Sequence, residues 1–151
     1  VKDAVGAMRA CWESEESVYS GSYYQFPPIR SFPKPAQKPS PPVYLPSIMF
    51  GDQWSPRVFK RIVEWGDGWL PVVESCKQLR EGLDRISMLF EEAGKPNLCR
   101  IRVLGAEGQW RHSEDIKEFS SLGVEEVILW LLNRKSSEIL KELDLLAREV
   151  L

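Results

Sequence analysis

The chain has few of the residues that build metal sites or imidazole-dependent sites. Of its 151 residues one is histidine, His112, and three are cysteines that lie far apart. One histidine excludes any site that needs two imidazole groups from the same chain. The cysteine positions match neither a zinc-binding spacing nor a Cys-x-x-Cys redox pair. We therefore expect no metal site, and we expect Cys11, Cys76 and Cys99 to be reduced, partly buried thiols.

The sequence also lacks a strong net charge and a long apolar run. The formal charge at pH 7 is −2 and the pI is near 5.6, which gives no reason to expect nucleic acid or an anionic membrane as a partner. No apolar segment approaches the roughly 18 residues needed to cross a bilayer, and the N-terminus has no charged-then-apolar signal peptide. We therefore predict a cytoplasmic protein with no membrane or nucleic-acid partner.

Proline, by contrast, is plentiful and concentrated in one segment. Eight of the 11 prolines lie within residues 27–46, where locked φ angles and missing N–H groups exclude a helix and disfavour a central strand. We expect a stiff, extended connector there, and a Pro-rich ligand for an SH3-type domain is the alternative. Before it, the pattern predicts a short amphipathic helix over residues 2–12 and a small hairpin or extended excursion over residues 17–26.

From residue 43 onward the pattern alternates between apolar strands and amphipathic helices. The expected strands are residues 43–50, 69–73, 100–105 and 126–132, and the helices that follow them are residues 55–65, 76–93, 113–122 and 136–150. Four β–α units in series predict a parallel sheet with right-handed crossovers. The apolar strands, above all the run at 127–132, are typical of strands buried on both faces.

The organisation predicted from these segments is a single domain over residues 1–151. Its parts are a helix and hairpin at 1–26, the Pro-rich connector at 27–42 and the β–α series at 43–151. Residues typical of helix starts support this series of β–α units. Ser55 followed by Pro56 is a start signal, and Ser75 followed three residues later by Gln78 fits a capping box. The last helix carries an apolar stripe formed by Leu140, Leu143, Ala147 and Val150.

One run carries more information than the rest, PPVYLPSIMFGDQWSPRVFKRIVEWGDGWLP at residues 41–71. Together with its lead SFPKPAQKPSPPVYL and the upstream segment AVGAMRACWESEESVYSGSYYQF, it resembles the luciferase-like monooxygenase superfamily. The resemblance is closest to the probable F420-dependent oxidoreductases of that superfamily, and it covers residues 1–75 well. It implies the C-terminal half of a TIM (β/α)8 barrel, whose full length is about 250 residues or more. An open, doubly wound flavodoxin-like sheet is the alternative, because four β–α units alone do not specify closure.

The resemblance also implies a cofactor site. In the resembling enzymes the turn after the corresponding strand holds the phosphate of the cofactor, FMN or F420, through small residues and a helix start. The candidate cofactor-binding residues are Gly51, Gln53, Trp54, Ser55 and Arg57. The turn departs from the family pattern, because it has a single glycine and because Asp52 would repel a phosphate. Trp54 could stack on a ring or cover the barrel end, and Arg57 could face the phosphate or solvent.

No catalytic residue can be assigned from the sequence. Neither a Ser-His-Asp set nor a carboxylate pair can be assembled, and we expect His112 to be a loop residue before a helix. Asp67, in the sequence Gly-Asp-Gly-Trp, lies on the amino-end side of the sheet, opposite the loops that carry function in barrels. We expect it to shape a tight turn rather than to act in catalysis.

The function implied is that of a half-barrel fragment or relative of a flavin- or F420-dependent oxidoreductase. We expect no catalysis by this chain alone, because the other half of the family barrel supplies much of the substrate pocket. The alternative is a non-catalytic α/β assembly or binding module. Unpaired strand edges and an uncovered inner face favour association. We therefore predict a homodimer, or pairing with a missing N-terminal half.

Overall fold

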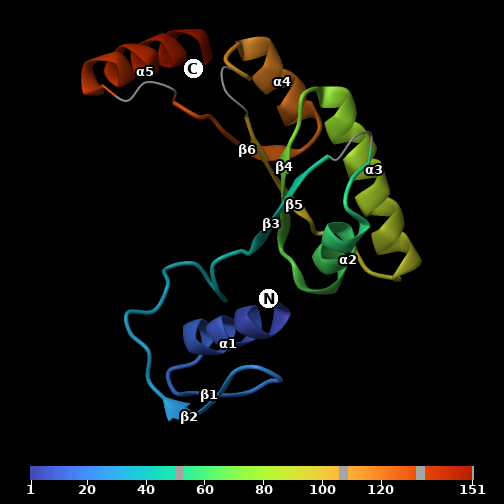
Figure 1. Ribbon diagram of the computed structural model, residues 1–151, viewed down its shortest axis with the longest axis vertical. Helices are drawn as coiled ribbons and strands as arrows, with labels where there is room; N and C mark the ends of the chain where they lie inside the picture. The colour runs from blue at the N-terminus through green and yellow to red at the C-terminus, as the bar shows by residue number, and fades with distance from the viewer. Residues whose placement is uncertain (50–52, 106–108, 132–134, 151) are drawn as a thin grey trace. The chain divides into compact units, whose positions relative to one another are not determined.

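The structure is a computed structural model that describes residues 1–49, 53–105, 109–131 and 135–150, with no side chain described for Val150 (Figure 1). Contacts divide the chain into two compact units, Val1–Pro42 and Val43–Leu151. The division falls where the sequence predicts that the connector ends and the β–α series begins. The single-domain organisation stays a prediction.

The first unit is a helix with a hairpin. It contains α1 (Lys2–Glu13), β1 (Ser17–Ser20) and β2 (Gln25–Ile29), and the two strands pair antiparallel in a sheet of their own. The expected helix and hairpin are thereby confirmed. Pro27 and Pro28 lie within β2, which has a ladder partner on one side only, so their missing N–H groups are tolerated.

The second unit is an α/β structure with four parallel strands. Its elements are β3 (Tyr44–Ile48), α2 (Pro56–Trp65), β4 (Gly68–Val72), α3 (Cys76–Glu92), β5 (Arg100–Leu104), α4 (Ser113–Ser121), β6 (Val124–Ile128) and α5 (Ser136–Val150). The strand order is β3-β4-β5-β6, and every pair is parallel. This confirms the predicted α/β class and series of units. The sequential order is that of half a barrel, whereas a doubly wound sheet reverses its order at a switch point.

Local capping explains where α2 and α3 begin. Ser55 is the N-cap of α2, and Pro56 occupies the first helical position, where its missing N–H costs nothing. Ser75 caps α3 by accepting a 3.3 Å hydrogen bond from the backbone N–H of Gln78. In a capping box the side chain of Gln78 would accept a hydrogen bond from the N–H of Ser75. Here it accepts instead from the N–H of Glu74, the residue before the N-cap, at 2.8 Å.

The fourth strand of the sheet differs from its prediction. The apolar run predicted a strand over residues 126–132, but β6 begins at Val124 and ends at Ile128. The reason is electrostatic pairing with β5, where Glu125 and Glu126 form ion pairs with two arginines. Leu129–Leu131 follow the strand, and Trp130 is 57% exposed. The prediction from hydrophobicity therefore placed this strand too late in the sequence, because β6 contains two glutamates near its start. Residue 132 lies outside the described residues.

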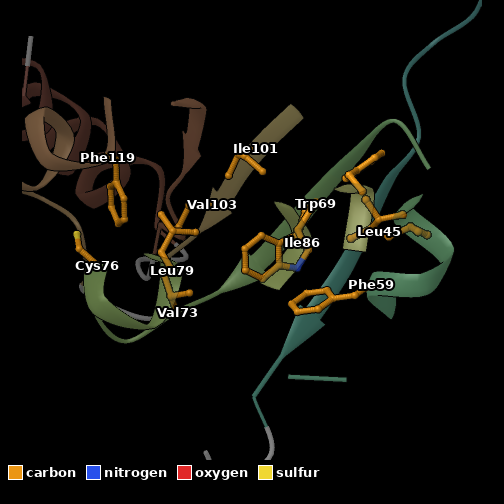
Figure 2. Packing of buried hydrophobic residues seen from close by; sticks show 12 residues of the cluster. Leu45, Phe59, Trp69, Val73, Cys76, Leu79, Ile86, Ile101, Val103 and Phe119 are labelled. Atoms are coloured by element: carbon orange, nitrogen blue, oxygen red, sulfur yellow. The ribbon is translucent and has the colours of Figure 1, made fainter. Parts of the chain in front are cut away.

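Helices α2, α3 and α4 cover one face of the sheet. Alternate strand residues point to that face, and they pack against apolar side chains of the three helices (Figure 2). The buried cluster consists of Leu45, Phe59, Ile62, Trp69, Val73, Cys76, Leu79, Ile86, Phe90, Ile101, Val103 and Phe119. Trp69 is at its centre with 0% exposure.

The other face of the sheet carries the alternating residues that point away from these helices, and we call it the inner face. Its members are Tyr44, Pro46, Ile48, Gly68, Leu70, Val72, Arg100, Arg102, Leu104, Glu126 and Ile128. Glu125, at the irregularity in the pairing of β6 with β5, belongs to this face as well, because its carboxylate accepts hydrogen bonds from Tyr44 and Arg100. Helices α2, α3 and α4 lie on the opposite face, and Ile48 is 48% exposed. Across the described part of the chain, no helix has the length and apolar character of a membrane span.

Candidate cofactor-binding site

The candidate site is built on the start of α2, directly after the carboxyl end of β3. Ser55 adopts extended backbone angles (φ −67°, ψ 110°), and its hydroxyl makes no capping hydrogen bond to the helix. The first N–H groups of a helix have no partner within the helix, and the helix dipole gives this end a partial positive charge. Arg57 lies exposed in the same first turn. Here Pro56 has no N–H, and the N–H of Val58 donates to the Ser55 carbonyl at 3.0 Å. The helix start therefore offers an anion mainly a hydroxyl, a guanidinium and the partial charge of the helix dipole.

A hollow of about 300 Å³ connects this helix start with the inner face of the sheet. It is lined by Pro46, Ser47, Ile48, Ser55, Val58, Leu70, Val72 and Leu104. Ser55 gives it a polar group at the helix start, whereas the strand residues give it an apolar wall. A ligand with an anionic end and a flat apolar part fits this division of chemistry.

Four of the five residues predicted from the sequence are described, and the structure places them in different surroundings. Ser55 lines the hollow, and Arg57 is exposed on α2 near it along the chain. Gln53 and Trp54 instead line a second, larger cavity of about 760 Å³ on the helix-covered side of the sheet. Gly51 lies outside the described residues, as does Asp52. Of the described candidate residues, Ser55 is the one at which the hollow and the helix start meet.

Trp54 packs with other aromatic side chains of the second unit. Its ring meets the ring of Trp69 edge-on, with centroids 4.9 Å apart and planes at 79°, and it lies 6.2 Å from the ring of Phe59. Its Nε1 points toward Gly82 of α3, where the absence of a side chain leaves room. The structure shows Trp54 packed against the helix-side core, which is a different position from the two considered in the sequence analysis.

The larger cavity is a groove between α2 and α3 that the sequence did not reveal. Trp54, Phe59, Val63 and Leu89 give it an apolar lining. Charged residues of both signs also line it: Lys60, Glu64, Arg85, Glu92 and Lys95. The lining residues come from two helices that are distant in sequence, and each helix by itself reads as an ordinary amphipathic segment. Only their packing brings the residues together.

The two thiols with shifted pKa values are poor nucleophiles. Burial raises the pKa of Cys76 to about 11, helped by the Glu118 carboxylate, and burial raises that of Cys99 to about 12. Both thiols are therefore protonated near neutral pH. All three cysteines are free, as predicted. His112 precedes α4 as its N-cap, also as predicted, and its N–H lies 3.4 Å from a carboxylate oxygen of Asp115.

Asp67 ties strand ends together at the amino end of the sheet. Its carboxylate accepts a 2.7 Å hydrogen bond from the N–H of Val43, and its own N–H donates to the Val43 carbonyl at 3.0 Å. Its carbonyl accepts from the N–H of Arg100 at 3.1 Å. These bonds link the starts of β3, β4 and β5. The expected conformational role of Asp67 is confirmed, on the end opposite the hollow.

The described residues contain no cluster of three or more His, Cys, Asp or Glu side chains arranged to hold a metal ion. The chemistry available at the hollow is therefore that of binding and orientation. The hollow has a helix start for an anion and an apolar wall, and no acid or base is among its lining residues that the structure describes. A bound group would have to supply the reactive atoms.

Comparison with known proteins identifies the family of the chain and several relatives. A family model described as luciferase-like monooxygenase matches residues 1–106. The uncharacterized proteins Mb0978c of Mycobacterium bovis and Rv0953c of Mycobacterium tuberculosis are each 25% identical to the chain over 150 residues. Each match covers 99% of this chain and 50% of the relative. The chain thus spans about half the length of the curated relatives it matches.

Proposed function

The chain belongs to the luciferase-like monooxygenase family, and we propose that it is a half-barrel part of a flavin- or F420-dependent oxidoreductase that binds the cofactor through Ser55 and Arg57. The observation that carries the proposal is the hollow of about 300 Å³, because it joins the start of α2 to the apolar carboxyl end of the inner face. Barrel enzymes bind their ligands at this end of the strands.

The residues present fit a phosphate-bearing cofactor with a flat ring. Ser55 has a hydroxyl that does not cap the helix, so the hydroxyl is available to phosphate oxygens at the positive end of the helix dipole. Arg57, in the same turn, adds a planar guanidinium that suits phosphate. The apolar wall formed by Ile48, Val72 and Leu104 suits a ring system.

FMN or F420 would supply hydride transfer when bound, with the substrate losing or gaining the hydride. The chain's own residues would hold the phosphate and keep water from one side of the ring. None of the described residues that line the hollow is an acid or a base, so groups outside this lining would have to handle the substrate's proton. We therefore expect no turnover by this chain alone.

The test is a binding titration of the purified chain with FMN and, separately, with F420, followed by fluorescence quenching and by co-elution. Ser55→Ala and Arg57→Ala should each weaken binding several-fold, because each removes a phosphate contact. Lys60→Ala is the matched control, since Lys60 lies one turn further along α2 and lines the groove between the helices. Inorganic phosphate should compete with the cofactor.

Absence of binding to either cofactor at high micromolar concentration would contradict the proposal. The second candidate, a non-catalytic assembly or binding module, would then account for the chain. It is favoured by a separate observation, the apolar part of the inner face, where Ile48 is 48% exposed and Val72, Leu104 and Ile128 are half-buried, because such a surface suits a protein partner.

A further inference from the structure

Three surfaces of the second unit are left open by the described helices and strands of that unit. The edge strands β3 and β6 each pair on one side only. The inner face leaves Ile48 48% exposed. The apolar stripe of α5 is also open, with Leu140 63% and Leu143 45% exposed. A sheet with two open edges and an apolar face is a template for association.

The amino-end half of the inner face is ionic. Arg100 Nε lies 2.8 Å from a carboxylate oxygen of Glu125, and Arg102 Nε lies 2.9 Å from one of Glu126. The Arg102 guanidinium also sits 4.3 Å from the centre of the Tyr44 ring. Gly68 makes this arrangement possible, because a side chain there would overlap the Tyr44 ring. Two arginines and two glutamates leave this half without net charge.

The carboxyl-end half of the inner face is apolar. Ile48 pairs in register with Val72, Val72 with Leu104, and Leu104 with Ile128, so one row across all four strands carries aliphatic side chains. The inner face is therefore divided along the strand direction into a neutral ionic half and an apolar half. Any partner that covers it must match both halves.

We propose that the occupant of the inner face is a second copy of this chain, packed with its strands running in the same direction. In that orientation the apolar halves of the two copies meet, and the ionic halves meet with no net charge to repel. The opposite orientation would place the aliphatic row of one copy against the arginines and glutamates of the other. That would strip water from charged groups without providing new partners, which is strongly unfavourable.

A dimer whose two-fold axis runs parallel to the strands would cover all three surfaces. It pairs β6 of each copy with β3 of the other, which yields an eight-stranded closed sheet and removes both open edges. A helix that follows a strand in a right-handed β–α unit lies over that strand and the next. For α5 the next strand is β3 of the second copy. Closure therefore places apolar surface beneath the stripe of Leu140 and Leu143.

The first experiment measures the mass of the chain in solution by size-exclusion chromatography with light scattering at tens of micromolar. We expect twice the chain mass of 17.4 kDa. Leu104→Glu, in the aliphatic row, should raise the dissociation constant about 100-fold or more, and Leu143→Glu on α5 should also weaken the dimer. Met88→Glu is the control, because Met88 is 51% exposed on α3, on the other side of the sheet. Circular dichroism establishes that each variant is folded.

The second experiment tests the orientation of the two copies. Chains carrying Leu104→Glu and chains carrying Leu104→Arg should each be monomeric alone, and an equimolar mixture should form dimers. In the same-direction arrangement the two substituted positions face each other across the core, so opposite charges can pair. With strands opposed, residue 104 of each copy would face the other's ionic end, and mixing would restore nothing.

The proposal is independent of cofactor binding, because both experiments read mass alone. It is overturned if the unmodified chain is a monomer at tens of micromolar, or if Leu104→Glu leaves the dimer as strong as Met88→Glu does. It is also overturned if the monomer instead forms a stoichiometric complex with a separately produced polypeptide spanning the other half of a relative. Failure of the mixture to dimerise would overturn the same-direction arrangement.

Discussion

The Nε1 of Trp69 donates a 2.6 Å hydrogen bond to the Oγ of Ser47, and both residues are buried, Trp69 completely and Ser47 with 8% exposure. The bond joins β4 to β3 on the helix-covered face. It allows a tryptophan to occupy the centre of an apolar core, because its one polar atom has a partner.

Ser47→Ala should lower the free energy of unfolding by about 1–3 kcal/mol, because the indole N–H would stay buried without an acceptor. Denaturant unfolding followed by tryptophan fluorescence measures the change. Ser87→Ala is the control, since Ser87 accepts a hydrogen bond from Asn97 at an exposed position, and its effect should stay within about 0.5 kcal/mol. Equal losses of unfolding free energy in the two variants would contradict the expected cost of leaving the buried indole N–H without an acceptor.

Asp67→Ala should cost about 1–2 kcal/mol, because the N–H of Val43 loses a charged acceptor at 2.7 Å. Asp84→Ala provides the comparison, since Asp84 is an exposed residue on α3 and its replacement should be nearly neutral. Chemical unfolding of both variants under the same conditions gives the difference. A tolerated Asp67→Ala would contradict the structural role of the turn.

Gly82→Ala should destabilise the protein although alanine is the better helix former. The new Cβ would overlap Cη2 of Trp69 and lie 3.1 Å from Nε1 of Trp54. Overpacking of this kind costs about 1–3 kcal/mol, against a gain in helix propensity of about 1 kcal/mol. Met88→Ala, at an exposed position of the same helix, should change stability by about 0.5 kcal/mol or less. A raised melting temperature for Gly82→Ala would refute the packing around Trp69.

Acid should loosen the hairpin from α1 through Asp3. Burial opposes ionisation of this carboxyl, but hydrogen bonds from the N–H groups of Tyr23, Tyr24 and Ser22 and from the hydroxyl of Tyr19 outweigh it, so its pKa is lowered. An aspartate in an unfolded chain has a pKa of about 3.9. The stabilisation by Asp3 is therefore fully present above that pH and is lost as the pH falls through the lower folded-state pKa.

An NMR titration of the Asp3 carboxyl measures this effect directly, with the amide signals of Tyr23 and Tyr24 as reporters of the hairpin. Both amides should shift together with the carboxyl. In Asp3→Asn the amide shifts should no longer follow that titration. A folded-state pKa at or above the ordinary value would contradict the arrangement of donors around Asp3.

The series of β–α units could be predicted from the sequence because its signals are local. Ser75 and Gln78 are three residues apart, and Ser55 and Pro56 are adjacent, so the start of each helix is encoded within one turn. The start of β6 could not be predicted in the same way. Glu125 and Glu126 read as surface residues until Arg100 and Arg102 are placed beside them by strand pairing.

The candidate site was predicted in part for the same reason. The start of α2 is visible in the sequence, and Ser55 does line a cavity. Trp54 is its neighbour in the chain, yet it packs toward α3, because the direction of a side chain at a turn depends on the residues that come to meet it. Leu104 was not predicted at all, since its place in the hollow depends on the register of β5 with β4.

The strand order β3-β4-β5-β6 follows the order of synthesis, so each strand finds its neighbour after a single intervening helix. Loop-closure entropy for such short separations is small, and folds dominated by near-neighbour contacts form quickly. The sheet can therefore grow from its first strand as the polypeptide emerges, and each new unit extends an edge that is already ordered. A truncation after β4 and α3, or after β5 and α4, would remove one partner of the last remaining strand but leave its pairing with the preceding strand in place.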